Sequence, residues 1–544
     1  LGLSPDEAHR YFVPRKFLHH FKEVLESDVP KALSNVKFDT HRIMNTSGIM
    51  LGGPWVDTPC LDFLYDEDTR ENRHGLKDVA WDYFGIPMEE YKKLFGKEDS
   101  RTFVPGHPKF EIFLDYATLD PWATRKVAIY LMEQLSQIPV WPDDANSTLT
   151  LKDMYWESEE PQLKALWQME RRGIKLNKER LVEISKTLEI EMEQVARELN
   201  RLVGWPINPG SGPQIAKFLF EQLGHTPLAF TPGGKPQTDE ATLEHFALGS
   251  HQVGECKLIL QYKKAQKLKG TYADGLLRAL ANGERVHTTY NSLKVTGRLS
   301  SSDPNLQNVP RPDTDSHGIR AAFIPGEGNV LIVADYGQLE MRILAWASGD
   351  VTMIEGIESG LDMHSFTAAR MSGMDYDTFF KAKKAEEPWA LQIRTAAKSV
   401  GFGIVYGITK YALSKQLSES LGRYVSEAEA QSYIDMYLDT FPGVRAYMND
   451  TKMFAKRYAY VQTLCGRFRR LSKIRSKNGG ERGHAERQSI NAPIQGSAAD
   501  IVKRTMLLCE ADDYLRLDLG CYLLHQVHDE LIFECPRETA EEAA

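Results

Sequence analysis

The sequence has little cysteine, and its cysteines follow no metal-binding spacing. Six cysteines are scattered over 544 residues without a CxxC motif, which argues against a zinc ribbon or a disulfide framework. Unpaired thiols are typical of proteins in a reducing compartment. We therefore expect an intracellular protein.

The sequence also lacks long apolar runs, a signal peptide, internal repeats and low-complexity segments. No apolar run approaches the length of a membrane-spanning helix, so no membrane partner is expected. The chain begins with Leu1 rather than methionine, which predicts that it starts partway into a longer protein. Its length exceeds that of one hydrophobic core, so roughly three or four domains are expected.

Positive charge is outweighed over the whole chain, whose formal net charge of −9 argues against nucleic acid as a partner. Binding depends on local fields, however, rather than on the total charge. Residues 257–272 are rich in lysine, and residues 466–487 hold eight arginines or lysines against two glutamates. Such runs are usually solvated faces, but beside a catalytic centre they would suit a polyanion.

Two acidic segments are informative as a pair, although either alone is a weak signal. Asp335 ends the apolar strand predicted for "NVLIVADY", and Asp529 lies within "HQVHDELIFE", on or beside a second predicted buried strand. Burying an unpaired carboxylate is costly, which implies a cation or a hydrogen-bonding partner. Two carboxylates delivered by separate strands suit a pair of Mg²⁺ ions. The alternatives are a solvated hairpin turn at Asp529 and a helix cap at Asp335.

A cationic and aromatic stripe is predicted on the helix "RTAAKSVGFGIVYG", residues 394–407. Its members recur at intervals of four and therefore share one helix face: Arg394, Lys398, Phe402 and Tyr406. A triphosphate would lie on the cations and a base on the aromatic rings. The glycines of this segment predict close packing or a bend. An amphipathic core helix is the alternative.

A second stripe consists of hydrogen-bond donors on the helix that contains "INAPIQGSAADIVKR". It comprises Arg487, Asn491 and Gln495. Every Watson–Crick pair presents acceptors in the minor groove, so such donors would test base-pair geometry without reading sequence. The alternative is a set of amides that caps or bridges helices.

Together these segments resemble the family A DNA polymerases. "VADYGQLEMRILAWASGD" is similar to the first palm motif of the family, "RTAAKSVGFGIVYG" to its fingers helix and "QVHDELIFE" to its second palm motif. "TGRLSSSDPNLQNVP" and "INAPIQGSAADIVKR" match two further signatures, in the order of the family. The resemblance extends over about residues 160–535.

The resemblance implies a role for each matching residue. The catalytic group would be Asp335, Asp529, Glu530 and Lys398, with two Mg²⁺ ions (Mn²⁺ being an alternative) held by Asp335, Tyr336 and Asp529. The deoxynucleotide would be bound by Gln338, Glu340, His364, Arg394, Lys398, Phe402 and Tyr406. DNA would be contacted by Arg298, Asn305, Gln307, Arg487, Asn491, Gln495 and His528. Glu340 would exclude a ribose 2′-hydroxyl, and Lys398 would protonate the departing pyrophosphate.

The N-terminal region resembles the 3′–5′ exonuclease domain of the same family. "NVKFD" and "YATLD" match its second and third motifs and imply Asp39, Tyr116 and Asp120 as site residues. The first motif, an Asp-x-Glu pair expected upstream of "RYFVP", is missing from the sequence. A metal site short of two carboxylates should bind metal poorly, so we expect weak proofreading or none.

The resemblance implies a mixed α/β, multidomain fold: a right hand with an N-terminal ribonuclease H-like exonuclease domain. The expected domains are an incomplete exonuclease (1–145), connector and thumb (146–287), first palm part (288–350), fingers (351–484) and second palm part (485–544). No 5′-nuclease domain is expected.

The expected activity is template-directed DNA synthesis in replication or repair. The partners would be a DNA primer–template and deoxynucleoside triphosphates; a processivity factor is left open, and the chain should be monomeric. It should reside in the cytoplasm of a bacterial or phage-infected cell, or in another reducing compartment. Three rival functions are a polymerase that uses ribonucleotides or an RNA template, an inactive DNA-binding scaffold, and a nuclease alone.

Overall fold

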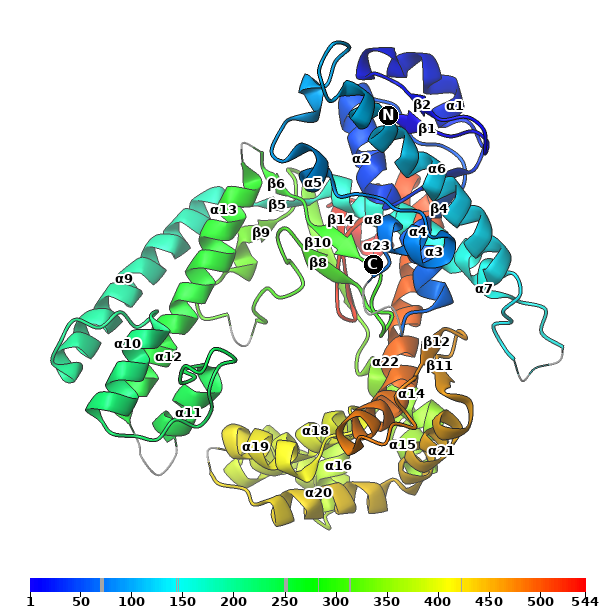
Figure 1. Cartoon of the computed structure of the whole chain (residues 1–544). Coiled ribbons are helices and arrows are strands. Elements are labelled where there is room, and N and C mark those ends of the chain that lie inside the picture. Colours follow the sequence, from blue (N-terminus) through cyan, green and yellow to red (C-terminus); the bar gives the residue numbers. More distant parts are fainter. Residues whose placement is uncertain are drawn as a thin grey trace.

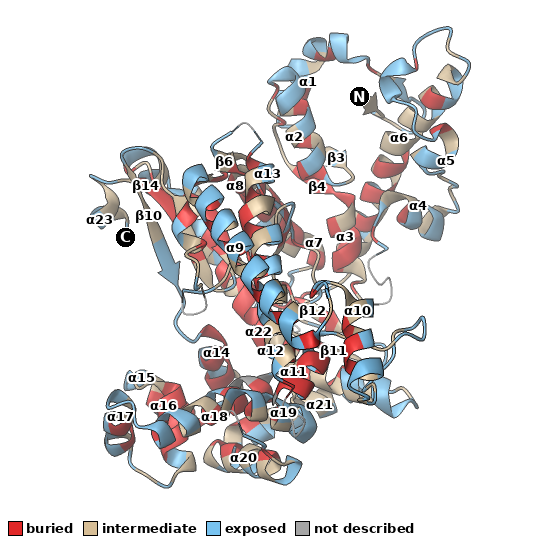
Figure 2. Cartoon of the chain, turned by 90° about the vertical axis from the view of Figure 1, so that its left-hand side faces the viewer, coloured by how far each residue is buried: buried red, intermediate tan, exposed pale blue. Residues whose placement is uncertain are grey.

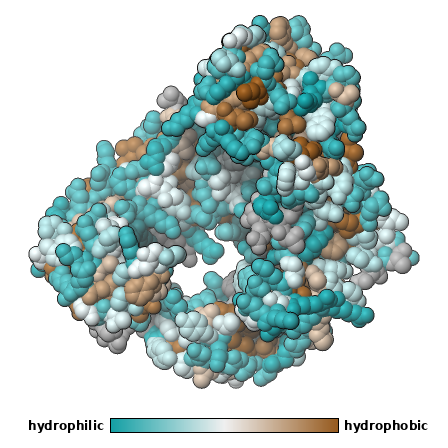
Figure 3. Space-filling model, viewed as in Figure 1, coloured by the Kyte–Doolittle hydropathy of each residue, from teal (hydrophilic) through white to brown (hydrophobic). Residues whose placement is uncertain are grey.

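The computed structural model describes residues 1–68, 73–142, 144, 146–248, 253–281, 283–312, 315–421 and 423–544, with only the backbone of Leu248, Phe402 and Val405. The chain is arranged around a central opening (Figure 1), which the space-filling view also shows, with a largely hydrophilic rim (Figure 3). None of the described helices is both long enough and apolar enough to cross a bilayer.

An N-terminal lobe lies at the top of Figure 1. Its strands pair as β1 with β2 and, in parallel, β3 with β4. The strands are β1 (Gly2–Leu3), β2 (Tyr11–Phe12), β3 (Lys31–Leu33) and β4 (Trp55–Asp57). The helices are α1 (Lys22–Glu26), α2 (Val36–Ser47), α3 (Thr58–Tyr65), α4 (Leu76–Phe84), α5 (Tyr91–Phe95) and α6 (Phe110–Leu135).

A helical arm follows two connecting helices and extends to the left of Figure 1. Its long helix begins where the Asn177 side chain accepts a hydrogen bond from the Arg180 amide at 2.9 Å, a typical N-cap. The connecting helices are α7 (Leu151–Met154) and α8 (Glu160–Arg172). The arm consists of α9 (Lys178–Val203), α10 (Gly212–Ala216), α11 (Glu240–Leu248), α12 (Gly254–Lys267) and α13 (Asp274–Leu280).

The central sheet has the strand order β10-β14-β13 and is antiparallel. Its strands are β10 (Asn329–Asp335), β13 (Tyr522–Val527) and β14 (Glu530–Pro536). Small sheets beside it contain β5 (Ile174–Leu176), β6 (Arg285–Val286), β7 (Thr289–Asn291), β8 (Ser300–Ser302) and β9 (Phe323–Ile324). Helices α8, α22 (Gly479–Ala511) and α23 (Ala540–Ala543) contact the central sheet, and α14 (Leu339–Ser348) packs against α22.

An outer lobe of helices occupies the bottom of Figure 1. It contains α15 (Val351–Glu358), α16 (Met363–Met371), α17 (Tyr376–Lys384), α18 (Pro388–Val405), α19 (Lys410–Leu421), α20 (Glu427–Thr440) and α21 (Pro442–Tyr458). A hairpin of β11 (Tyr460–Gln462) and β12 (Phe468–Arg470) leads from it to α22. The helical prediction for residues 360–460 is thus confirmed.

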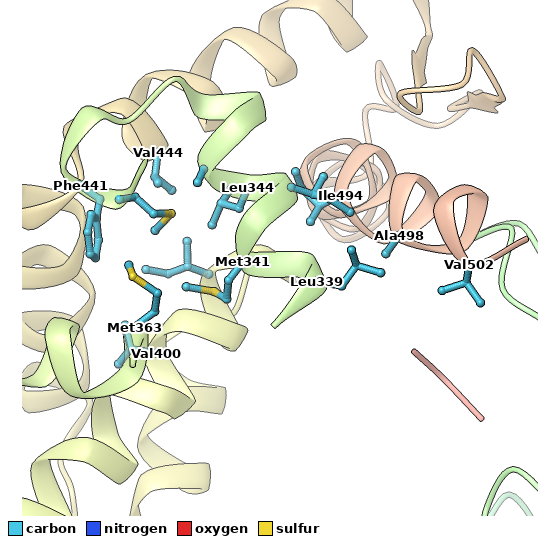
Figure 4. Close-up of a cluster of buried hydrophobic side chains, with 14 of the residues drawn as sticks. Leu339, Met341, Leu344, Met363, Val400, Phe441, Val444, Ile494, Ala498 and Val502 are labelled. Carbon is cyan, nitrogen blue, oxygen red and sulfur yellow. The ribbon is translucent and has the colours of Figure 1, made fainter. Parts of the chain in front are cut away.

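One buried apolar cluster joins α14, α22 and the outer lobe to the central sheet. In Figure 4, Leu339 and Leu344 of α14 approach Ile494 of α22, while Met341 faces Met363 and Val400 of the outer lobe. Burial of these side chains stabilises the contact at about 25 cal/mol per Å² of apolar surface. Helix α14, which follows β10, is therefore held against both α22 and the outer lobe.

The mixed α/β fold agrees with the prediction, but the burial of β10 does not. Val333 is 56% exposed and Asp335 is also exposed, whereas the sequence predicts a buried strand. Figure 2 shows the end of β10 in the colour of exposed residues. The reason is the strand order, because β10 is an edge strand that pairs only with β14 among the described residues. The predicted domain limits stay a prediction.

Candidate active site

Asp335 and Asp529 lie at the same end of the central sheet. Asp335 is paired in register with Glu530, the first residue of β14, and the Tyr336 amide donates to the Asp529 carbonyl at 3.1 Å. Val527 is also paired with Glu530, so His528 and Asp529 form the two-residue turn between β13 and β14. The hairpin-turn alternative is therefore correct for the backbone, yet this turn delivers Asp529 beside Asp335.

The helix-cap alternative for Asp335 is wrong. The N-cap of α14 is Gln338, which adopts a left-handed backbone conformation at φ +57° and makes no capping hydrogen bond through its side chain. Asp335 is three residues earlier, in the strand, and so caps nothing there. Its carboxylate is available for another purpose.

The electrostatics of this end of the sheet favour a bound cation. Burial raises the pKa of Asp529, Arg298 lowers it, and the negative charge of Asp335 raises it further. Among the described residues no group of three His, Cys, Asp or Glu side chains could hold a metal. Mg²⁺, however, is usually bound by one or two carboxylates together with substrate phosphates. The oxygen donors of Asp335 and Asp529 therefore fit such an ion.

Glu340 connects this end of the sheet to the outer lobe. It lies in the first turn of α14, is buried, and is hydrogen-bonded to the Arg298 guanidinium. The Tyr406 hydroxyl donates to its Oε2 at 3.3 Å. Burial raises the pKa of Glu340, with Asp529 adding to the effect and Arg298 opposing it. Glu340 therefore interacts with one residue predicted to bind the nucleotide (Tyr406), one predicted to bind metal (Asp529) and one predicted to bind DNA (Arg298).

The predicted cationic stripe lies on α18. Arg394 binds the Asp362 carboxylate, with Nη2 at 2.9 Å and Nε at 3.0 Å from Oδ2. Lys398, one turn later, is exposed. Burial lowers the pKa of His364 to about 4, against the opposing effect of Asp362, with Arg394 and Lys398 adding to the lowering. His364 is therefore a neutral partner within a cationic group near pH 7.

The aromatic half of the stripe departs from the prediction. α18 ends at Val405, so Tyr406 lies in the following turn rather than on the helix. The side chain of Phe402 lies outside the described residues. Gly407 has φ +65°, and a Cβ there would come within 2.8 Å of Cγ of Arg487. The predicted close packing is thus real, and it brings the end of α18 against α22.

The second stripe follows one face of α22. The Asn491 amide donates to Oε1 of Gln495 at 3.3 Å, while its own Oδ1 is buried without a hydrogen-bond partner among the described residues. The amides therefore pair within one helix instead of bridging two. A buried acceptor without a partner is unusual in a folded protein and indicates a ligand or water there.

The remaining predicted DNA contacts have partners within the chain. Oδ1 of Asn305 accepts from the Gln307 amide at 3.1 Å. The Gln307 side chain is buried and donates to Oε1 of Gln526 at 2.8 Å. His528 is exposed in the hairpin turn. Glu530, which the resemblance places in the catalytic group, has a neighbour that the sequence did not suggest. Its Oε1 lies 3.8 Å from Nη2 of Arg320.

A second acidic group lies in the N-terminal lobe. Asp39 of α2 carries a pKa raised to about 6 by burial and then by Asp57 and Asp120. Tyr116 and Asp120 both lie on α6, and burial followed by Asp120 raises the pKa of Tyr116 to about 12. The structure thus brings the three predicted residues together. Asp57 was missed, although it ends β4 just as Asp335 ends β10.

Two family descriptions match the chain. Residues 178–544 match "DNA polymerase family A", and residues 6–136 match "3'-5' exonuclease". DNA polymerase I of Bacillus subtilis (strain 168) is 34% identical over 551 residues, which cover 99% of this chain and 58% of the relative. Thermostable DNA polymerase I of Thermus filiformis is 41% identical over 394 residues, 72% of this chain and 44% of the relative. The chain thus spans about half the length of these relatives.

A solved structure resembles almost the whole chain. It is the POL domain of Pol1 from M. smegmatis, in complex with DNA primer-template and dNTP. The TM-score is 0.79 at 31% sequence identity, over 97% of this chain and 83% of that chain.

Proposed function

Because the chain belongs to DNA polymerase family A, we propose that it carries out template-directed DNA synthesis, adding deoxynucleotides to a primer 3′-hydroxyl. The observation that carries the proposal is the convergence of Asp335, Asp529 and Glu340 at one end of the central sheet, where Tyr406, just after α18, contacts Glu340. The M. smegmatis structure, which holds a primer–template and a nucleotide, supports the same substrates for this chain.

The carboxylates of Asp335 and Asp529, with the Tyr336 carbonyl, are the groups that hold two Mg²⁺ ions in this proposal. When bound, such a pair neutralises the entering and leaving oxygens of an in-line displacement. Glu530 supports the site through its place beside Asp335 in the register. Mn²⁺ suits the same oxygen donors.

The outer lobe binds the triphosphate in this proposal. Arg394, held by Asp362, presents a planar guanidinium that suits phosphate oxygens. His364 donates a hydrogen bond in its neutral form, and the exposed Lys398 is the proton donor to the leaving pyrophosphate. Tyr406 and Gln338 contact the base and sugar, the role that the resemblance also gives to Phe402.

In this proposal the DNA duplex lies on the side of the nucleotide that faces away from the outer lobe. Arg298, Arg487 and His528 are its positively charged or donor contacts, and Asn491 and Gln495 test the minor groove of the newest base pair. Asn305 and Gln307 hold the neighbouring loop. The lysine-rich stretch 257–272, which covers most of α12 and the segment after it, binds the phosphate backbone of the duplex in this proposal.

Primer extension in Mg²⁺ with all four deoxynucleotides tests this function. We expect extension to the end of the template and none when the divalent cation is chelated. Binding of the primer–template without any extension would instead favour the DNA-binding scaffold.

Glu340→Ala is expected to raise ribonucleotide incorporation relative to deoxynucleotide incorporation by at least about tenfold. Glu340 is held rigidly by Arg298 and Tyr406, so its bulk blocks a 2′-hydroxyl. The measurement is the ratio of kcat/KM for matched ribo- and deoxynucleotides on one template.

Glu340→Gln is the matched control, because it removes the charge and keeps the bulk. Discrimination should stay close to that of the unaltered chain. Equal ratios for Glu340→Ala and the unaltered chain would remove Glu340 from this role and reopen ribonucleotides as substrates.

Removal of mismatched 3′ ends is expected to be slow. The N-terminal lobe presents Asp39 and Asp120, whereas Asp57 is buried and accepts from the Val36 amide at 2.7 Å. We propose that this set binds Mg²⁺ weakly and supports little proofreading. In a nuclease assay on a mismatched primer, the unaltered chain and Asp39→Ala should both excise the 3′ end at a rate close to that of a blank without protein. Rapid excision that Asp39→Ala abolishes would contradict the proposal.

We further propose that the chain acts as a monomer in a reducing cytoplasm. Bacterial relatives support this setting. A replicative role, a repair role and a processivity factor all stay open.

A further inference from the structure

Tyr290 uses all of its polar groups in the buried region between the N-terminal lobe and the central sheet. It lies on β7, and its amide donates to Oε1 of Glu170 at 2.8 Å. Its carbonyl accepts from Nζ of Lys37 at 2.6 Å. Its hydroxyl is hydrogen-bonded to Nδ1 of His525 and accepts from the Gln526 amide at 3.3 Å. One residue therefore connects α2 and α8 with β13.

Gln526 continues the connection to the hairpin turn. Its Nε2 donates to the carbonyl of His528, and its Oε1 accepts from the Gln307 side chain at 2.8 Å. His528 has φ +54°, a left-handed conformation that is unfavourable for a residue with a Cβ. The hydrogen bond from Gln526 helps to hold this turn, and Asp529 is its second residue.

The connection is buried from Lys37 to Gln526, and only its end at His528 is exposed. The side chains of Lys37, Glu170, Tyr290, His525 and Gln526 are all buried. Lys37 lies two residues before Asp39 on α2, and it forms an ion pair with Glu170. Buried hydrogen bonds are strong and costly to leave unmade. These hydrogen bonds therefore fix the positions of the connected side chains, which packing alone would not do.

We propose that Tyr290 and Gln526 are positioning residues for polymerisation: they hold the His528–Asp529 turn and anchor it to Glu170 and Lys37. This inference rests on the proposed function. A phenylalanine at position 290 would fill the same volume, so packing alone does not require the hydroxyl. The hydroxyl matters because it binds two consecutive residues of the strand that leads into the turn.

Tyr290→Phe tests the proposal, since it removes the hydroxyl and keeps the ring. His525 and the Gln526 amide lose a partner, and the turn loses its fixed geometry. In single-turnover incorporation by the full chain, we expect the maximal rate to fall by about tenfold. The apparent Kd values for nucleotide and primer–template should change by less than about twofold, because neither ligand touches Tyr290 in this proposal.

Tyr155→Phe is the matched control. The Tyr155 hydroxyl is also buried, donates to the Trp55 carbonyl at 2.8 Å and accepts from the Asp57 amide at 2.8 Å. It has the same chemistry at a distance from the hairpin turn. Its maximal rate of incorporation should equal that of the unaltered chain.

Gln526→Met provides a second variant if Tyr290→Phe does not fold. It removes the donor to the His528 carbonyl with little change in volume and should slow incorporation to a similar extent. The two changes together should slow the reaction by less than the product of their separate effects, because they interrupt one connection.

The outcomes separate this inference from the proposed function. If the unaltered chain does not extend a primer, both are overturned. If it extends and Tyr290→Phe or Gln526→Met retains its rate, this inference alone is wrong. It is also wrong if Tyr155→Phe is slowed equally, or if only the Kd for DNA changes, since either result indicates general destabilisation.

Discussion

Replacing Asp335 or Asp529 with asparagine is expected to slow primer extension by at least about a thousandfold while the primer–template stays bound. Each change preserves the shape of the side chain and removes one negative charge from the site. Loss of a carboxylate that holds a catalytic cation removes several kcal/mol of stabilisation, which corresponds to such a factor in rate. Single-turnover incorporation at saturating DNA measures the effect.

Asp518→Asn is the control for this prediction. Asp518 is an exposed residue that precedes β13, so the same change of charge should leave the rate unchanged. DNA binding should not weaken in the two site variants, because a carboxylate repels the phosphate backbone. Extension near the unaltered rate by Asp335→Asn would exclude that carboxylate from the chemistry.

Arg467→Ala is expected to destabilise the junction between the connecting helices and α22 by about 3–5 kcal/mol. Nη2 of the buried Arg467 lies 2.5 Å from Oε1 of Glu159, and its Nε lies 3.0 Å from Oδ1 of Asp500. Lys503 is the other cation, 3.7 Å from Glu159. Without Arg467, two buried carboxylates share one lysine. The measurement is the urea midpoint of the transition that disrupts this junction.

Arg445→Ala is the matched control, because Arg445 forms a 2.6 Å ion pair with Asp439 at an exposed position. A surface pair contributes less than about 1 kcal/mol, so the midpoint should hardly move. A similar shift for both variants would contradict the importance of the buried pairs.

The same cluster has a defined pH dependence. Burial would raise the pKa of Glu159, but Arg467 and Lys503 outweigh burial and lower it to about 2. The folded-state pKa is thus below the ordinary value, so the stabilisation is complete above about pH 4.5. It is lost as the pH falls from there toward 2. Arg467→Ala should flatten this part of the stability curve.

Local sequence patterns predict two structural features of the candidate site. An apolar strand that stops at Asp335 and a cationic helix face at Arg394 and Lys398 are both visible from spacing alone. The structure retains both features. Patterns of this kind survive because they are set by the period of a single helix or strand.

Features that depend on distant pairing could not be predicted. The exposure of β10 follows from its edge position in the sheet. The contact of Glu340 with Arg298 joins two segments that no sequence pattern places side by side. The end of α18 before Tyr406 is set by the turn at Gly407 and its packing against Arg487. The hydrogen bond of Tyr290 to His525 joins residues 235 positions apart, which no local pattern predicts.

The choice of nucleotide opposite each template base is the most direct test of template-directed synthesis. Four primer–templates that differ only in the first templating base would each be offered the four deoxynucleotides singly, in Mg²⁺. We expect efficient addition of the complementary nucleotide alone on every template. Addition that ignores the template base, or no addition despite bound DNA, would contradict template-directed synthesis by this chain.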